Sequence, residues 1–145
     1  HRQTGASVIG VEEVSEALTS SYGIVGTRDN EQGFMEIETI VEKPRPAEAP
    51  SRLGVIGRYI LDPSIFACLR NVRPGAGGEI PLTDGIAALL ATHPVLALPL
   101  IGERYDCGSR HGFIKATIDY AMDHDDIRED MLDHMQSELA REGRL

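Results

Sequence analysis

The sequence has few of the features that mark membrane-spanning, disulfide-rich or metal-binding proteins. Its longest nearly apolar stretches, residues 86–91 and 95–101, are far shorter than the roughly 20 residues that cross a bilayer. The two cysteines, Cys68 and Cys107, lack the spacing of a metal site, and the N-terminal residues do not resemble a signal peptide. We therefore expect a cytoplasmic protein with reduced thiols and no contact with a membrane.

Positive charge is also scarce. The chain holds 14 basic and 23 acidic residues, for a formal net charge of -9, which is the wrong sign for a protein that binds a phosphate backbone. We expect no nucleic-acid partner. With 145 residues, 41% of them hydrophobic and 26% charged, the composition is that of one ordinary soluble domain. The acidic excess is concentrated in residues 119–145.

The pattern predicts a mixture of strands and helices, with strand runs early and helices late, which indicates an α/β or α+β fold. The last predicted helix places Ile127, Met131, Met135 and Leu139 at four-residue steps, a stripe that predicts docking onto its own domain or onto a partner subunit. Strands are predicted at residues 7–11, 22–27, 34–42, 53–61 and 95–101, and helices after Asp62 and at 82–92, 109–124 and 125–141.

The beginning of the chain is unusual. It starts with His1 rather than methionine, and a strand-like run follows within a few residues. This pattern predicts that the sequence is a fragment of a longer protein.

The first candidate site lies where the strand at 34–42 ends, at Glu42, Lys43 and Pro44. The chain has only two lysines, and a lysine ammonium is a compact ligand for phosphate, whereas a carboxylate accepts hydrogen bonds from sugar hydroxyls. Proline at 44 predicts extended geometry at Lys43, so the two side chains would face one ligand only if the strand twists or bulges there. A solvated surface pair is the alternative interpretation.

Two loops are further candidates. Residues 73–79 are rich in glycine and end in Glu79, but they lack the Gly-Lys-Ser/Thr ending of a P-loop, so the glycines are also explained by tight turns. Asp106 precedes a helix that Ser109 is expected to cap, at the carboxyl end of a strand region. Its carboxylate suits Mg²⁺, and an Asx-turn is the competing interpretation.

Several segments together resemble the bacterial UTP-glucose-1-phosphate uridylyltransferases, also called UDP-glucose pyrophosphorylases. The matching segments keep the order and spacing of that family over most of residues 7–122. They are residues 21–25 (SYGIV), 40–44 (IVEKP), 57–61 (GRYIL), 75–84 (GAGGEIPLTD) and 105–113 (YDCGSRHGF). Pro81 stands where the family usually has glutamine, and Gly85 where it often has alanine.

The resemblance implies the C-terminal part of a Rossmann-related, glycosyltransferase-A-like α/β fold, with a mixed sheet and flanking helices. It also implies transfer of uridylyl from UTP to glucose 1-phosphate with Mg²⁺ as cofactor, in a complete enzyme that is a homo-oligomer. Residues 1–124 would be the sugar-phosphate-binding half, and 125–145 an acidic amphipathic helix. The Gly-rich nucleotide loop at the start of family members has no counterpart here.

The resemblance also implies roles for individual residues. Lys43 would be the catalytic residue that holds the sugar phosphate, Glu42 would bind glucose hydroxyls, and Gly23 would offer backbone contacts to the sugar. Asp106 would be a metal ligand, and the list of substrate-binding candidates is completed by Arg58 and Glu79. The alternatives are another sugar-1-phosphate nucleotidylyltransferase, such as a thymidylyl transferase, and a non-catalytic binding or assembly fragment.

Overall fold

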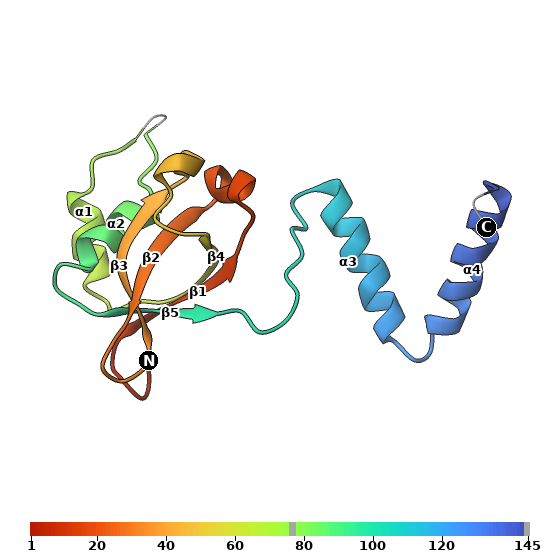
Figure 1. The fold of residues 1–145 in the computed structure, drawn as a ribbon, viewed down its shortest axis with the longest axis horizontal. Helices are drawn as coiled ribbons and strands as arrows, with labels where there is room; N and C mark the ends of the chain where they lie inside the picture. Colours follow the sequence, from red (N-terminus) through yellow and green to blue (C-terminus); the bar gives the residue numbers. More distant parts are fainter. Residues whose placement is uncertain (76–77, 144–145) are drawn as a thin grey trace. The chain divides into compact units, whose positions relative to one another are not determined.

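The computed structural model describes residues 1–75 and 78–143, which form two compact units, His1–Ile101 and Gly102–Leu145. The first unit contains five strands, two α-helices and two 3₁₀ helices, and the second contains two α-helices (Figure 1). No helix within the described ranges is long and apolar enough to span a membrane. The predicted boundary at residue 124 stays a prediction.

The elements follow the predicted order, with most strands early and the α-helices late. The strands are β1 (Ser7–Glu13), β2 (Gly23–Asp29), β3 (Met35–Glu42), β4 (Leu53–Ile60) and β5 (Val95–Pro99); the short 3₁₀ helices are η1 (Glu16–Ser21) and η2 (Pro46–Glu48); the α-helices are α1 (Ile65–Asn71), α2 (Leu82–Leu89), α3 (Arg110–Asp123) and α4 (Arg128–Arg141).

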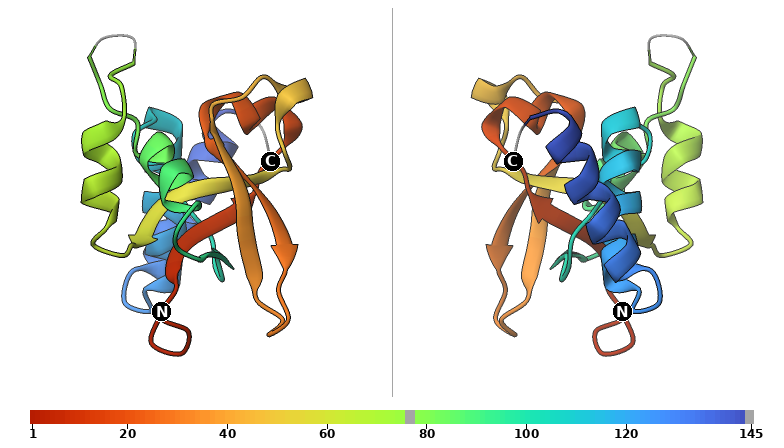
Figure 2. Two further views of the ribbon diagram at one scale, coloured as in Figure 1. Left: turned by 90° about the vertical axis from the view of Figure 1, so that its left-hand side faces the viewer. Right: turned by 90° about the vertical axis from the view of Figure 1, so that its right-hand side faces the viewer.

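The five strands form one mixed sheet that closes on itself in the order β1-β4-β2-β3-β5. β1 and β5 are parallel, and the other neighbours are antiparallel. β2 and β3 form the predicted hairpin, an arm of the sheet that Figure 2 shows in orange. The side chain of Asn30 fixes its turn by accepting hydrogen bonds from the Gln32 and Phe34 amides. The prediction of a mixed sheet with flanking helices is confirmed.

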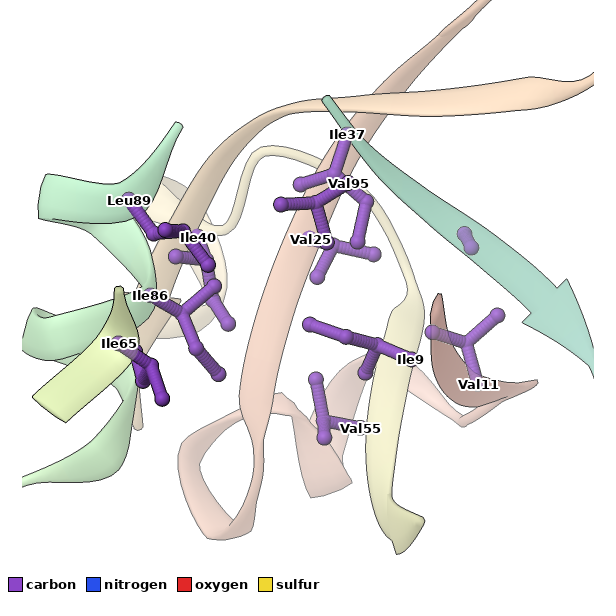
Figure 3. Close-up of a cluster of buried hydrophobic side chains, with 11 residues drawn as sticks. Ile9, Val11, Val25, Ile37, Ile40, Val55, Ile65, Ile86, Leu89 and Val95 are labelled. Atoms are coloured by element: carbon purple, nitrogen blue, oxygen red, sulfur yellow. The ribbon is translucent and has the colours of Figure 1, made fainter. Parts of the chain in front are cut away.

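The core of the first unit lies between the sheet and the two helices α1 and α2. Branched aliphatic residues from the strands, such as Ile9 and Val25, meet Ile65 of α1 and Ile86 and Leu89 of α2 (Figure 3). Ile9, Val25, Ile86 and Leu89 are completely buried, and each contributes roughly 1.5–3 kcal/mol by leaving water. This packing fixes α2 against the sheet and so places its first turn beside β2.

The second unit is a pair of helices joined by a short turn (Figure 1). Ser109 caps α3 as predicted, because its hydroxyl accepts the Gly112 amide at 3.0 Å. α4 begins at Arg128, three residues later than the sequence predicts. Its acidic first turn, with Glu129 and Asp130, suits the positive end of the helix dipole.

Candidate functional site

The candidate site in the first unit lies where the β2–β3 ladder ends. Gly23, the first residue of β2, pairs with Glu42, the last residue of β3. One further hydrogen bond, from the Lys43 amide to the Tyr22 carbonyl at 3.0 Å, closes the ladder. The chain then leaves the sheet through Pro44, which has no amide hydrogen to donate.

The extended geometry predicted for Lys43 is wrong. Lys43 has φ of 44°, and it is the only residue other than glycine with positive φ in the described part of the chain. A left-handed residue breaks the alternation of side chains along a strand, so Lys43 does not point away from Glu42. Instead its Nζ lies 3.6 Å from Glu42 Oε1. The left-handed turn at Lys43 thus brings the two side chains together, whereas in a straight strand they would point to opposite faces.

The left-handed conformation carries a cost. For a residue with a Cβ it is unfavourable by about 1–2 kcal/mol, and glycine would adopt it freely. Strained backbone of this kind is found preferentially at functional sites. Both side chains of the pair remain reachable from solvent, since Lys43 is 61% and Glu42 37% exposed. The acid and the base can therefore meet a ligand without rearrangement of the core.

Gly23 leaves no room for a side chain at this point. A Cβ on Gly23 would lie 2.8 Å from Thr83 Cγ2 and 3.3 Å from Glu42 Oε2. The glycine thus allows α2 and the Glu42 carboxylate to approach the β2 backbone closely. Glu42, Gly23 and Lys43, three residues predicted from the sequence, are brought together by the structure.

Thr83, which the sequence analysis did not single out, joins the same cluster. It lies in the first turn of α2 and is only 7% exposed. Its Oγ1 has no hydrogen-bond partner among the residues that the structure describes. A buried hydroxyl without a partner is unfavourable, and in native proteins it is a candidate for an external ligand. The sequence signal that could have identified Thr83 is its position in residues 75–84, one of the segments that carry the family resemblance.

Tyr59, the neighbour of Arg58 on β4, interacts electrostatically with Glu42. Burial raises the pKa of the Tyr59 phenol, and the negative charge of Glu42 raises it further. Arg58 lines a different hollow, together with Gly10 and Leu98 on the β1 and β5 strands, and its guanidinium donates to the Gly57 carbonyl. No contact joins Arg58 to Glu42 within the described residues, so its role as a binding residue stays a prediction.

Glu79 lies in the glycine-rich loop before α2. Its carbonyl accepts the Gly75 amide at 2.8 Å, and the Gly75 carbonyl accepts the Gly78 amide at 3.1 Å, so the described part of the loop is a closed turn. Residues 76–77, which belong to the predicted loop, lie outside the described residues. The structure fixes the loop backbone at Glu79 but leaves the role of its exposed carboxylate a prediction.

Asp106 lies in the second unit, in the turn before α3. Its Oδ1 accepts the Gly108 amide at 3.1 Å, which is an Asx-turn, and its carbonyl accepts the Ser109 amide and hydroxyl. The two interpretations of Asp106 are compatible, because the turn uses one carboxylate oxygen. Mg²⁺ is often held by one or two carboxylates with phosphate oxygens, so the donor chemistry of Asp106 fits one ligand of such a site.

Within the described ranges no group of three or more His, Cys, Asp or Glu side chains is placed to hold a metal by itself. A magnesium site at Asp106 would therefore depend on substrate oxygens or on residues outside these ranges.

Comparison with known proteins decides the family. The nucleotidyl transferase family model matches residues 1–123, which is most of the sequence. The chain belongs to the nucleotidyl transferase family. Within it, the chain is similar to UTP-glucose-1-phosphate uridylyltransferase 1 of Streptococcus pyogenes serotype M1, with 43% identity over 134 residues, and to the corresponding enzyme of Staphylococcus haemolyticus, with 43% identity over 132 residues.

Solved structures of nucleotidyl transferases agree. A UDP-glucose pyrophosphorylase complexed with UDP-glucose matches with a TM-score of 0.77 and 39% identity, over 85% of this chain and 47% of that one. A UTP-bound enzyme of the same name from Acinetobacter baumannii matches with a TM-score of 0.79 and 36% identity, over 93% and 46%. The resemblance and the fold class predicted from the sequence are confirmed.

The match to the curated nucleotidyl transferases is partial. It covers 92% of this chain and 44% of the Streptococcus relative, and 91% and 46% for the Staphylococcus relative. The chain thus spans less than half the length of the proteins it resembles.

Proposed function

We propose that this chain carries the glucose 1-phosphate side of a UTP-glucose-1-phosphate uridylyltransferase. The observation that supports this most directly is the convergence of Glu42 and Lys43, produced by the left-handed backbone at Lys43. A carboxylate and an ammonium 3.6 Å apart match the two ends of a sugar phosphate. The naming of the relatives and of the solved structures supports the same activity.

The reaction joins two phosphates without a covalent enzyme intermediate. A phosphate oxygen of glucose 1-phosphate attacks the α-phosphorus of UTP, the bond to the β-phosphate breaks, and pyrophosphate leaves. Catalysis of this kind is mainly positioning and stabilisation of charge. The chain's part is to hold the attacking phosphate in line and to keep the sugar from rotating.

In this mechanism Lys43 binds the phosphate of the sugar, and its charge lowers the repulsion between the two phosphate groups. Glu42 accepts hydrogen bonds from glucose hydroxyls, and the Gly23 backbone lies beside it. The Thr83 hydroxyl, buried and without a partner in the described residues, gains one when the sugar binds. When bound, magnesium would supply positive charge to phosphate oxygens, and Asp106 is the residue of this chain that would serve as one of its ligands.

The setting of the reaction is part of the proposal. A soluble sugar phosphate and a nucleotide are the substrates, so the enzyme would act in carbohydrate metabolism in the cytoplasm. A homo-oligomer as the complete form is part of the same proposal.

Calorimetry on the 145-residue chain tests the sugar-phosphate side directly. We expect glucose 1-phosphate to bind, and Lys43→Ala to weaken binding by about 10- to 100-fold, because a hydrogen bond to a charged group contributes about 1.5–3 kcal/mol. Arg45→Ala is the matched control, since Arg45 lies two residues away and is paired with Glu48. Equal affinity in the Lys43 and Arg45 variants would remove Lys43 from the site.

The same titrations separate the alternatives. Binding of glucose 1-phosphate without binding of UTP supports a half-site, and binding of neither ligand supports a non-catalytic fragment. In a complete enzyme containing these residues, Lys43→Ala should reduce turnover severely while UTP binding persists. Turnover with dTTP exceeding that with UTP would point instead to a thymidylyl transferase.

A further inference from the structure

The segment that carries Asp106 is tied to α3 by side chains that the reaction itself does not use. Lys115 Nζ contacts Glu103 Oε1 at 2.7 Å, and the same ammonium lies 5.6 Å from the centroid of the Tyr105 ring. The Tyr105 hydroxyl hydrogen-bonds to the Asp119 carboxylate, and this bond raises the pKa of the phenol. Because positions 115 and 119 are four apart, both project from one face of α3.

The backbone at Asp106 is fixed at the same end of the helix. Gly112 lies so close that a Cβ there would be 2.1 Å from the Asp106 carbonyl oxygen. That oxygen also accepts the Ser109 hydroxyl at 3.0 Å, while Oδ1 of Asp106 accepts the Gly108 amide at 3.1 Å. The carbonyl and carboxylate of Asp106 are therefore fixed by hydrogen bonds to the residues that follow it. Tyr105, the residue before it, is fixed by its contacts with α3.

We propose that Lys115 and Asp119 are positioning residues, which hold the Tyr105–Asp106 segment so that the Asp106 carboxylate faces a divalent cation in one fixed orientation. The proposal rests on the proposed role of Asp106 as a magnesium ligand. Groups that orient a metal ligand typically change metal affinity by about 10- to 100-fold when they are removed.

An ordinary surface ion pair is the competing explanation, because Lys115 is 52% and Glu103 58% exposed. Such pairs contribute little, and their removal has no effect on a ligand several residues away. The ring of Tyr105 argues against a chance pair, because it contacts both Lys115 and Tyr120 of α3, with 6.1 Å between the two ring centroids, and so fixes the residue directly before Asp106. The two explanations predict different results for the orientation of Asp106.

The test measures the side-chain orientation of Asp106 and its affinity for Mn²⁺, a paramagnetic substitute for Mg²⁺, in the full chain, with glucose 1-phosphate present as a source of phosphate oxygens. Three-bond NMR couplings report the χ1 populations of Asp106, and broadening of the Gly108 amide signal reports bound Mn²⁺. The variants are Lys115→Met and Tyr105→Phe, with Lys115→Arg as the rescue. Arg141→Met is the matched control, because it removes another exposed ion pair, the one to Glu138 on α4.

We expect Asp106 to occupy a single χ1 rotamer in the wild type, and rotamer averaging with about 10-fold weaker Mn²⁺ binding in Lys115→Met and Tyr105→Phe. Lys115→Arg should restore both, and Arg141→Met should change neither. Unchanged couplings in both test variants would overturn the positioning role, even if Mn²⁺ broadens Gly108. Altered couplings without any Mn²⁺ broadening in the wild type would support positioning and refute Asp106 as a metal ligand.

Discussion

Replacing Thr83 with valine should make the protein more stable. Thr83 is 7% exposed, and its hydroxyl has no hydrogen-bond partner in the described part of the chain. Leaving such a group buried costs about 1–3 kcal/mol, and an apolar group of the same shape avoids that cost. Valine is nearly isosteric with threonine, so the packing of α2 against Gly23 is preserved. We expect the free energy of unfolding to rise by about 1–3 kcal/mol.

Urea denaturation followed by circular dichroism measures this change. With a slope of about 1–3 kcal/mol per molar urea, an increase of that size moves the midpoint upward by roughly 1 M. Thr19→Val is the matched control, because Thr19 is 1% exposed but its hydroxyl donates to the Glu16 carbonyl at 2.8 Å. That variant should be destabilised. A Thr83→Val protein that is no more stable than wild type would refute the reasoning about the unpartnered hydroxyl.

The same substitution should have the opposite effect on binding. If the hydroxyl gains its partner from the sugar, Thr83→Val loses one hydrogen bond to glucose 1-phosphate while the fold becomes more stable. A variant that is both more stable and a weaker binder is typical of a residue kept for function. Calorimetry with glucose 1-phosphate on both proteins checks the second half of this prediction.

Three further substitutions give clear expectations. Lys43→Gly should be about 1 kcal/mol more stable than Lys43→Ala, because only glycine adopts the left-handed backbone freely. Equal urea midpoints for the two variants would show that the backbone at this position is unstrained. Gly112→Ala should lower the free energy of unfolding by about 1–3 kcal/mol, because a Cβ at this position meets the Asp106 carbonyl. Alanine normally stabilises an unobstructed helix position relative to glycine, so a raised melting temperature would contradict the close contact. Ser64 donates its hydroxyl and its amide to Asp62, and these bonds lower the pKa of that carboxyl. The stabilisation by the Asp62 carboxylate should be complete above its ordinary pKa of about 3.9 and lost as the pH falls through its lower pKa in the folded protein. The urea midpoints of wild type and Asp62→Asn should therefore converge in acid. A difference that stays constant with pH would contradict this assignment.

The sequence predicts the elements well because strand and helix periods are local. Alternation in residues 34–42 indicates a strand, and Ser109 marks the start of α3, and both are confirmed. Closure of the sheet is not visible in the same way, since the pairing of β1 with β5 joins residues that are far apart in the chain. No local pattern records which edges of a sheet will meet.

The candidate site was predictable in composition but not in geometry. Glu42 and Lys43 stand out as an acid and a rare lysine at a strand end, yet proline at position 44 indicates the wrong backbone for Lys43. Thr83 becomes visible only once α2 is placed against Gly23, because its missing partner is a property of packing. The sequence thus identifies residues with suitable chemistry, whereas their convergence depends on one dihedral angle and one glycine.

The parallel pairing of β1 with β5 has a consequence for synthesis of the protein. Until residues 95–99 have left the ribosome, β1 and β3 each keep an edge that β5 would pair. Open strand edges attract other chains, and contacts between distant residues form slowly. Nascent chains that stall before Val95 should therefore aggregate or recruit chaperones, and release of β5 should end that vulnerable period.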